Sequence, residues 1–209
     1  VTIPSDRLKQ LQLNLVRSHA CGVGKPLNSE ETRVLMLLRA NVLAAGFSGA
    51  RPAVADQILA LLKANVLPQI PSRGSVGASG DLAPLAHLAL GLIGEGESLA
   101  DREWKSTSQA LKMAGIEPIE LQAKEGLALI NGTQAMGAVG LLALARAKTA
   151  LQTATLAGAI SLESLLGTPS AFDARISQAR RHEGQIRIAA MLSVLLQGSE
   201  IRESHRSGD

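Results

Sequence analysis

The sequence predicts an all-α, mainly helical protein with one long, buried central helix and a small irregular or hairpin element near residues 95–105. Three observations support this prediction. Apolar residues make up 46% of the chain and aromatic residues only 1%, so the core must be aliphatic, which favours closely packed helices. Apolar residues recur at helical spacing in several segments. The segment 133–166 contains no proline and few charges, as one continuous helix requires.

The first predicted helices carry clear end signals. The first begins at residue 5 or 6 and ends near residue 21, where Gly22 follows. The second extends to about residue 45 and opens with Asn28 and Glu31, which are spaced as a capping box. A third helix is predicted over residues 53–66.

The middle of the chain alternates helices with extended segments. Pro68 and Pro71 predict an extended approach to a glycine-rich loop. A helix over about 81–93 follows, then a small hairpin near residues 98–105. A short helix opens at residue 106 or 107 and ends near residue 115.

The predicted long helix over 133–166 has about 34 residues and a length of roughly 50 Å. It is apolar almost all round, which means burial in a bundle or in a membrane. Arg146 and Lys148 near its middle argue against a membrane span. The remaining helices are short, so helices from another chain or from further sequence are expected to cover it. A last helix is predicted over about 185–196, beyond a polar region that starts at Asp173.

Composition excludes several classes of function. The net charge is only +3 and the basic residues are scattered, which gives a nucleic-acid partner little support. The single cysteine, Cys21, and the lack of a recognisable signal peptide predict a reducing, cytoplasmic location. No metal-ligand spacing and no nucleotide-binding fingerprint is present, so no metal or nucleotide cofactor is expected.

The most informative stretch is residues 74–87, Gly-Ser-Val-Gly-Ala-Ser-Gly-Asp-Leu-Ala-Pro-Leu-Ala-His. Its three glycines permit tight bends with positive φ. Asp81 is a good N-cap for the helix that follows. The tripeptide before it therefore lies just ahead of a helix N-terminus, whose partial positive charge favours anions.

The tripeptide Ala78-Ser79-Gly80 can become an electrophile. In a tight bend, the Gly80 amide nitrogen can attack the Ala78 carbonyl, and loss of water closes a five-membered ring. Loss of the Ser79 hydroxyl as a second water leaves an exocyclic methylidene. The alternative, a glycine-rich turn that only caps a helix, suits an isolated Ala-Ser-Gly better than it suits the whole stretch.

Together with four further segments, this stretch resembles the aromatic amino-acid ammonia-lyases, which carry a methylidene-imidazolone group. The resemblance extends along almost the entire chain. It implies that Ala78, Ser79 and Gly80 form the prosthetic group, with Asp81 at the helix start beside it. It also implies that Asn131 lies near this group and the substrate, and that His19 faces the substrate ring. The further segments are 17–24, 46–49, 124–134 and 169–175.

The resemblance implies deamination of an aromatic L-amino acid by a homotetramer. The Ser18–His19 pair favours L-histidine, which would give urocanate and ammonia. Tyrosine or phenylalanine ammonia-lyases and aminomutases of the same family remain alternatives, because a histidine can also accept a tyrosine hydroxyl. A non-catalytic helical assembly protein is a further alternative.

The comparison with the family also predicts a central fragment. Residues 1–132 would be the part that bears the prosthetic group, and residues 133–209 the start of the central helix bundle. The family's catalytic tyrosine segment, its carboxylate-binding arginine and its C-terminal helical half are absent. With no tyrosine, the chain cannot supply a tyrosyl base.

Overall fold

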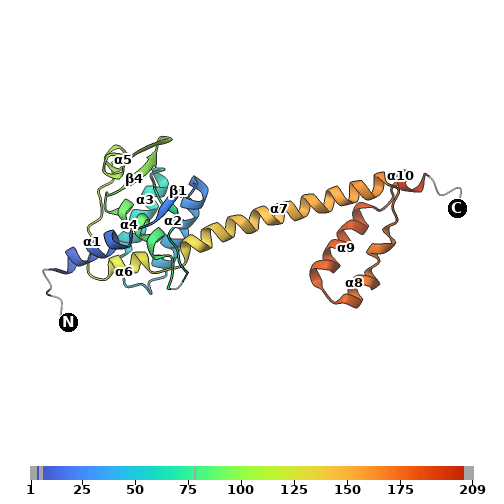
Figure 1. The fold of residues 1–209 in the computed structure, drawn as a ribbon, viewed down its shortest axis with the longest axis horizontal. Helices are drawn as coiled ribbons and strands as arrows, with labels where there is room; N and C mark the ends of the chain where they lie inside the picture. The colour runs from blue at the N-terminus through green and yellow to red at the C-terminus, as the bar shows by residue number, and fades with distance from the viewer. Residues whose placement is uncertain (1–3, 5–6, 78, 205–209) are drawn as a thin grey trace. The chain divides into compact units, whose positions relative to one another are not determined.

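The computed structural model describes residue 4, residues 7–77 and residues 79–204. It is mainly helical with a few short strands (Figure 1), as the sequence predicts. The chain divides into two compact units, residues 1–142 and 143–209, and the boundary falls inside the long helix α7, Gln134–Ser164. The functional division expected at residue 132 stays a prediction.

The helices of the first unit gather around α4, Leu82–Leu92 (Figure 1). This helix packs on α1 and α6, while α2 packs on α3. Most residues of α4 are buried because it is apolar on nearly every side. The residue that follows the candidate tripeptide therefore begins a helix at the centre of the core. The other helices are α1 Leu8–His19, α2 Ser29–Ala44, α3 Pro52–Lys63, α5 Thr107–Ala114 and α6 Glu125–Ile130.

Two small antiparallel sheets accompany these helices. The predicted hairpin is confirmed as β4, Glu97–Ala100, paired with β5, Glu103–Ser106. Asp101 and Arg102, with φ of +52° and +66°, form its two-residue turn, whose twist suits a hairpin.

The other strands are additions to the predicted fold. β2, Leu67–Pro68, pairs with β4, and β1, Val23–Pro26, pairs with β3, Pro71–Arg73. Prolines hold these segments extended, and they occupy short strands where a missing amide donor is tolerated.

The helix ends test the predicted caps. Asn28 and Glu31 form the expected capping box, with Glu31 N donating to Asn28 Oδ1 at 2.9 Å. Ser106 caps α5, and Gly115 ends it with φ of +66°. The first helix ends at His19 and not near residue 21, since Ala20 leaves the helical conformation. The start expected at residue 5 or 6 lies outside the described residues.

The second unit contains the rest of α7 and a set of shorter helices. The long helix is confirmed, with 31 residues. The polar region after Asp173 contains a helix that the sequence analysis misses. Asp173 caps this helix, since its side chain accepts from the Arg175 amide nitrogen at 2.9 Å. The last predicted helix is confirmed as α9. The elements are η2 Pro169–Phe172, α8 Ala174–Arg180, α9 Glu183–Leu195 and α10 Glu200–Glu203.

Apolar side chains along α7 are exposed in this chain, so its own described residues do not provide the burial that the sequence predicts. By length and composition alone, the helical stretch Glu125–Ser164 would also suit a membrane span, as core helices of bundles do. Coverage by further helices stays a prediction. The exposed side chains include Met136, Leu141, Leu144, Leu151, Leu156 and Ile160.

Candidate active site

The loop that precedes α4 bends as its glycines predict. Gly74, Gly77 and Gly80 have φ of +156°, +65° and +109°. Ser79 is exposed and Gly80 is half-buried, whereas Ala78 lies outside the described residues. The serine that would lose its hydroxyl as water is thus an exposed residue of the loop.

The backbone of Gly80 and Asp81 is held against Gly132. The Asp81 amide donates to the Gly132 carbonyl at 2.6 Å. A Cβ built on Gly80 would lie 2.7 Å from that same oxygen, closer than real Cβ atoms approach. Only glycine fits at position 80, which is also the residue whose amide nitrogen must be unhindered for ring closure.

Asp81 occupies the N-cap position of α4, as expected, but the predicted capping bond is wrong. Its side chain makes no hydrogen bond to the α4 backbone. Instead, Oδ1 accepts from Ser75 Oγ at 2.5 Å and Oδ2 accepts from the Met136 amide at 2.8 Å. The amide belongs to the first turn of α7, which has donors without helical partners and a partial positive charge. The fully buried carboxylate therefore joins the loop to α7.

Asn131 follows α6 directly and is exposed, in an extended backbone conformation. Its neighbour Gly132 makes the contacts with Gly80 and Asp81, so Asn131 is one residue away from the backbone that meets the loop. An exposed amide next to this loop can donate and accept hydrogen bonds while it stays neutral. Its catalytic role remains a prediction.

An ion pair between the buried Glu125 and the exposed Arg51 supports the start of α6, the helix that precedes Asn131. Glu125 Oε1 accepts from Arg51 Nε at 2.8 Å, and Oε2 accepts from Arg51 Nη2 at 2.8 Å and from the Gln122 amide at 2.7 Å. Burial raises the pKa of Glu125, but these bonds outweigh burial, so the pKa lies below its usual value. The carboxylate therefore stays charged at neutral pH.

His19 lies in the last turn of α1 and is half-buried. Its Nδ1 lies 2.8 Å from the Leu15 carbonyl oxygen, which can only accept, so Nδ1 carries the proton. In the neutral imidazole with this tautomer, the other ring nitrogen, Nε2, is a hydrogen-bond acceptor. Ser18 Oγ lies 3.1 Å from His19 Nδ1 and donates to the same carbonyl at 3.0 Å.

His87, in α4, contacts the segment that follows α1, a contact that the sequence analysis misses. The Gly22 amide donates to His87 Nε2 at 3.1 Å, which requires an unprotonated Nε2. Burial lowers the pKa of His87 and so favours this neutral form. The segment directly after α1, three residues beyond His19, thus contacts the helix that follows the tripeptide.

Arg39 and Gln134 form a second group that sequence reasoning misses. Arg39 is 1% exposed, and its Nη1 donates to Gln134 Oε1 at 2.7 Å. Burial lowers the pKa of Arg39 to about 10. The available signal was an arginine at a core-facing position, four residues from both Leu35 and Leu43.

The residues present fit the methylidene-imidazolone group. The bend with positive φ, the glycine that no other residue can replace and the exposed serine match the requirements of cyclisation. Among the described residues, no three histidine, cysteine or acidic side chains gather as a metal site would need.

Comparisons with known proteins place this fold among the helical ammonia-lyases and aminomutases. Histidine ammonia-lyase from Trypanosoma cruzi superposes with a TM-score of 0.87 at 43% identity, covering 96% of this chain and 40% of that chain. Tyrosine aminomutase from Streptomyces globisporus superposes with a TM-score of 0.88 at 42% identity, covering 95% of this chain and 37% of that chain.

The family model of the aromatic amino acid lyases matches residues 1–209, and the chain belongs to this family. Histidine ammonia-lyase from Koribacter versatilis is 56% identical over 206 residues, which cover 99% of this chain and 40% of that relative. The chain thus spans about 40% of the length of the curated relatives it matches.

Proposed function

We propose that the full-length protein containing this chain is a histidine ammonia-lyase, which converts L-histidine to urocanate and ammonia without oxidation. The observation that carries the proposal is the Ala78-Ser79-Gly80 loop, whose Gly80 is held against Gly132 with no room for a side chain. Relatives named histidine ammonia-lyase, at 56% identity, support the choice of substrate. In this proposal, residues 1–132 bear the prosthetic group and residues 133–209 begin the helix bundle.

The prosthetic group would form from Ala78, Ser79 and Gly80, and it would supply an electrophile that draws electrons from the substrate. Gly80 and Asp81 keep the loop bent through the bond to Gly132. The N-terminus of α4 begins directly after this loop, so its dipole favours negative charge that develops there.

Two side chains are assigned to the substrate. His19 keeps Nε2 as an acceptor, which suits the N–H of an imidazole ring. Asn131 offers a neutral amide beside the loop for hydrogen bonds to the substrate or the prosthetic group. The β-proton of the substrate needs a base, which a tyrosine of this chain cannot be because the chain has none.

A tyrosine ammonia-lyase or aminomutase is the second candidate. The Nε2 acceptor of His19 would equally suit a phenol hydroxyl, and tyrosine aminomutase from Streptomyces globisporus is 42% identical. Phenylalanine offers no donor to that nitrogen and fits less well. A non-catalytic assembly protein is a third candidate, favoured only by the exposed apolar side chains of α7.

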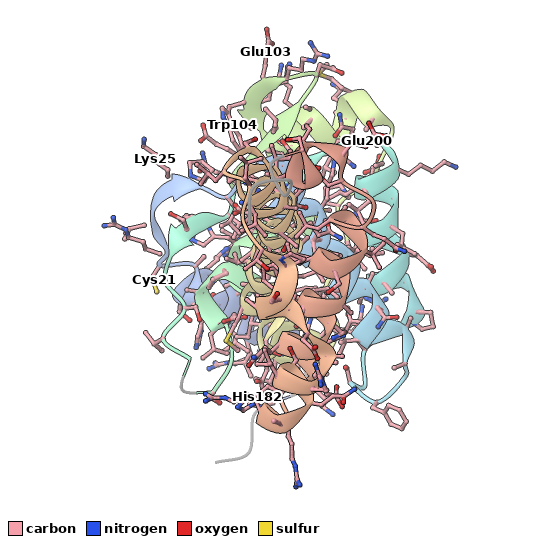
Figure 2. All side chains as sticks on the ribbon, turned by 90° about the vertical axis from the view of Figure 1, so that its right-hand side faces the viewer. Cys21, Lys25, Glu103, Trp104, His182 and Glu200 are labelled. Carbon is pink, nitrogen blue, oxygen red and sulfur yellow. The ribbon has the colours of Figure 1, made fainter. Side chains whose placement is uncertain are left out.

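Those apolar side chains also support a homotetramer, whose other helices would cover α7. Arg146 and Lys148 within α7 argue for a protein bundle and against a membrane. Cys21 is a free, exposed thiol (Figure 2), which suits the reducing cytoplasm. No nucleic acid, metal or nucleotide cofactor enters the proposal.

The test is a substrate comparison with the full-length protein. L-histidine, L-tyrosine and L-phenylalanine are incubated separately, and urocanate, coumarate, cinnamate and β-amino acids are quantified. We expect urocanate and ammonia in equal amounts from L-histidine and at least tenfold less product from the others. Preferential coumarate or a β-tyrosine product would support the second candidate, and no product from any substrate would support the third.

A further inference from the structure

Arg39 is a buried cation without a carboxylate partner among the described residues. It is 1% exposed in α2, and its one hydrogen bond among those residues goes to the neutral Gln134. Its Nε is buried without any partner in the described part of the chain. Taking a guanidinium out of water costs free energy, and the hydrogen bond at this site offsets little of that cost.

A buried charge of this kind adds little to stability compared with an apolar side chain of similar volume. Methionine would fill the same space without an unpartnered donor. Arg39 stays protonated at neutral pH, since its pKa of about 10 is still well above that range. A purely structural role in the core therefore explains the arginine poorly. Its contacts indicate a role near the tripeptide instead.

The contacts of Arg39 connect it to the tripeptide through Gly132. A Cβ built on Gly132 would lie 2.3 Å from Arg39 Nη1 and 2.1 Å from Gln134 Oε1, so both side chains lie directly against this glycine. On its other side, the Gly132 carbonyl accepts from the Asp81 amide and approaches Gly80. One glycine thus separates Arg39 from the backbone that must bend.

We propose that Arg39 is a positioning residue that, together with Gln134, holds Gly132 against Gly80 so that the tripeptide can cyclise. The inference rests on the proposed function. In the step concerned, the Gly80 nitrogen bonds to the Ala78 carbonyl carbon, and the oxygen leaves as water with the amide protons of Gly80 and Ser79. A second water takes the Ser79 hydroxyl and its α-proton. Arg39 neither gains nor loses an atom in these steps; it only keeps Gly132 in place against Gly80.

The experiment measures cyclisation in the full-length protein made by cell-free translation and sampled over time. Intact mass gives the fraction of chains that have lost two waters, and thermal unfolding gives stability. For Arg39→Met we expect cyclisation to slow by about 10- to 100-fold, the effect of a misplaced reacting group, while the melting temperature is unchanged or higher. Arg33→Met, on the same helix but bonded to Asn65 at the surface, is the matched control and should cyclise like the wild type.

Gln134→Leu is a second variant that tests the same inference, because it removes the acceptor that orients Arg39. We expect the same slowing in a folded protein. Wild-type rates in folded Arg39→Met or Gln134→Leu would overturn the inference and leave the proposed function intact. A melting temperature that falls in both variants together with cyclisation would also overturn it, since Arg39 would then be structural. A wild-type protein that never loses the two waters would overturn the proposed function as well.

Discussion

Replacing Gly80 by alanine perturbs a position where the loop has no room for a side chain. The backbone φ of +109° is unfavourable for an L-residue, which costs about 1–3 kcal/mol. The new Cβ would stand 2.7 Å from the Gly132 carbonyl oxygen, so that oxygen must move away from the Asp81 amide. Weakening this 2.6 Å bond costs about 1 kcal/mol more. The total destabilisation is about 2–4 kcal/mol.

The assay combines denaturant unfolding with intact mass in the full-length protein. Gly80→Ala should unfold earlier and should keep the mass of the open tripeptide, because the displaced backbone no longer brings its nitrogen to Ala78. Gly115→Ala is the control: its φ is +66°, but a Cβ there meets nothing within 4 Å. It should lose only about 1 kcal/mol and cyclise normally. Normal cyclisation in Gly80→Ala at unchanged stability would refute the close-packing argument.

Three further predictions concern Asp81, Ser79 and His87. Asp81→Ala should destabilise the protein by about 3 kcal/mol in denaturant unfolding, because Ser75 and the Met136 amide lose a charged acceptor; a loss below about 1 kcal/mol would contradict the assigned bonds. Ser79→Ala should retain the fold and lose nearly all lyase activity, since no hydroxyl can leave; near-normal turnover would exclude the proposed electrophile. The pKa of His87 is lower in the folded protein than in the unfolded chain, so the unfolded state binds more protons. The stabilising effect of His87 is therefore complete above pH 6.5, the unfolded pKa, and decreases as the pH falls through the folded pKa. Between neutral and acidic pH, the free energy of unfolding should fall less for His87→Gln than for the wild type. An identical pH profile in the two proteins would show that His87 does not cause this pH dependence.

Local signals in the sequence predicted the fold well. The capping box of Asn28 and Glu31, the cap at Ser106 and the end at Gly115 all depend on residues within a few positions of one another. The hairpin near residues 97–106 was predictable for the same reason. The single tryptophan, Trp104, is 45% exposed on that hairpin (Figure 2), in agreement with a core built from aliphatic residues.

Contacts between distant residues were beyond such reasoning. Asp81 looked like an ordinary N-cap, but its carboxylate bonds to Met136, 55 residues further along the chain. The pair of Arg39 and Gln134 spans 95 residues, and spacing alone does not indicate that they meet. The loop itself was predictable because its chemistry lies in three consecutive residues, whereas the contacts that hold it come from three other segments.

The most direct test of the account is the mass of the tryptic peptide 74–102 from active, full-length protein, which contains the whole loop between Arg73 and Arg102. If Ala78, Ser79 and Gly80 form the electrophile, this peptide is lighter than its sequence requires by the mass of two water molecules. A peptide with the complete sequence mass, from a preparation that releases ammonia from L-histidine, would contradict the account.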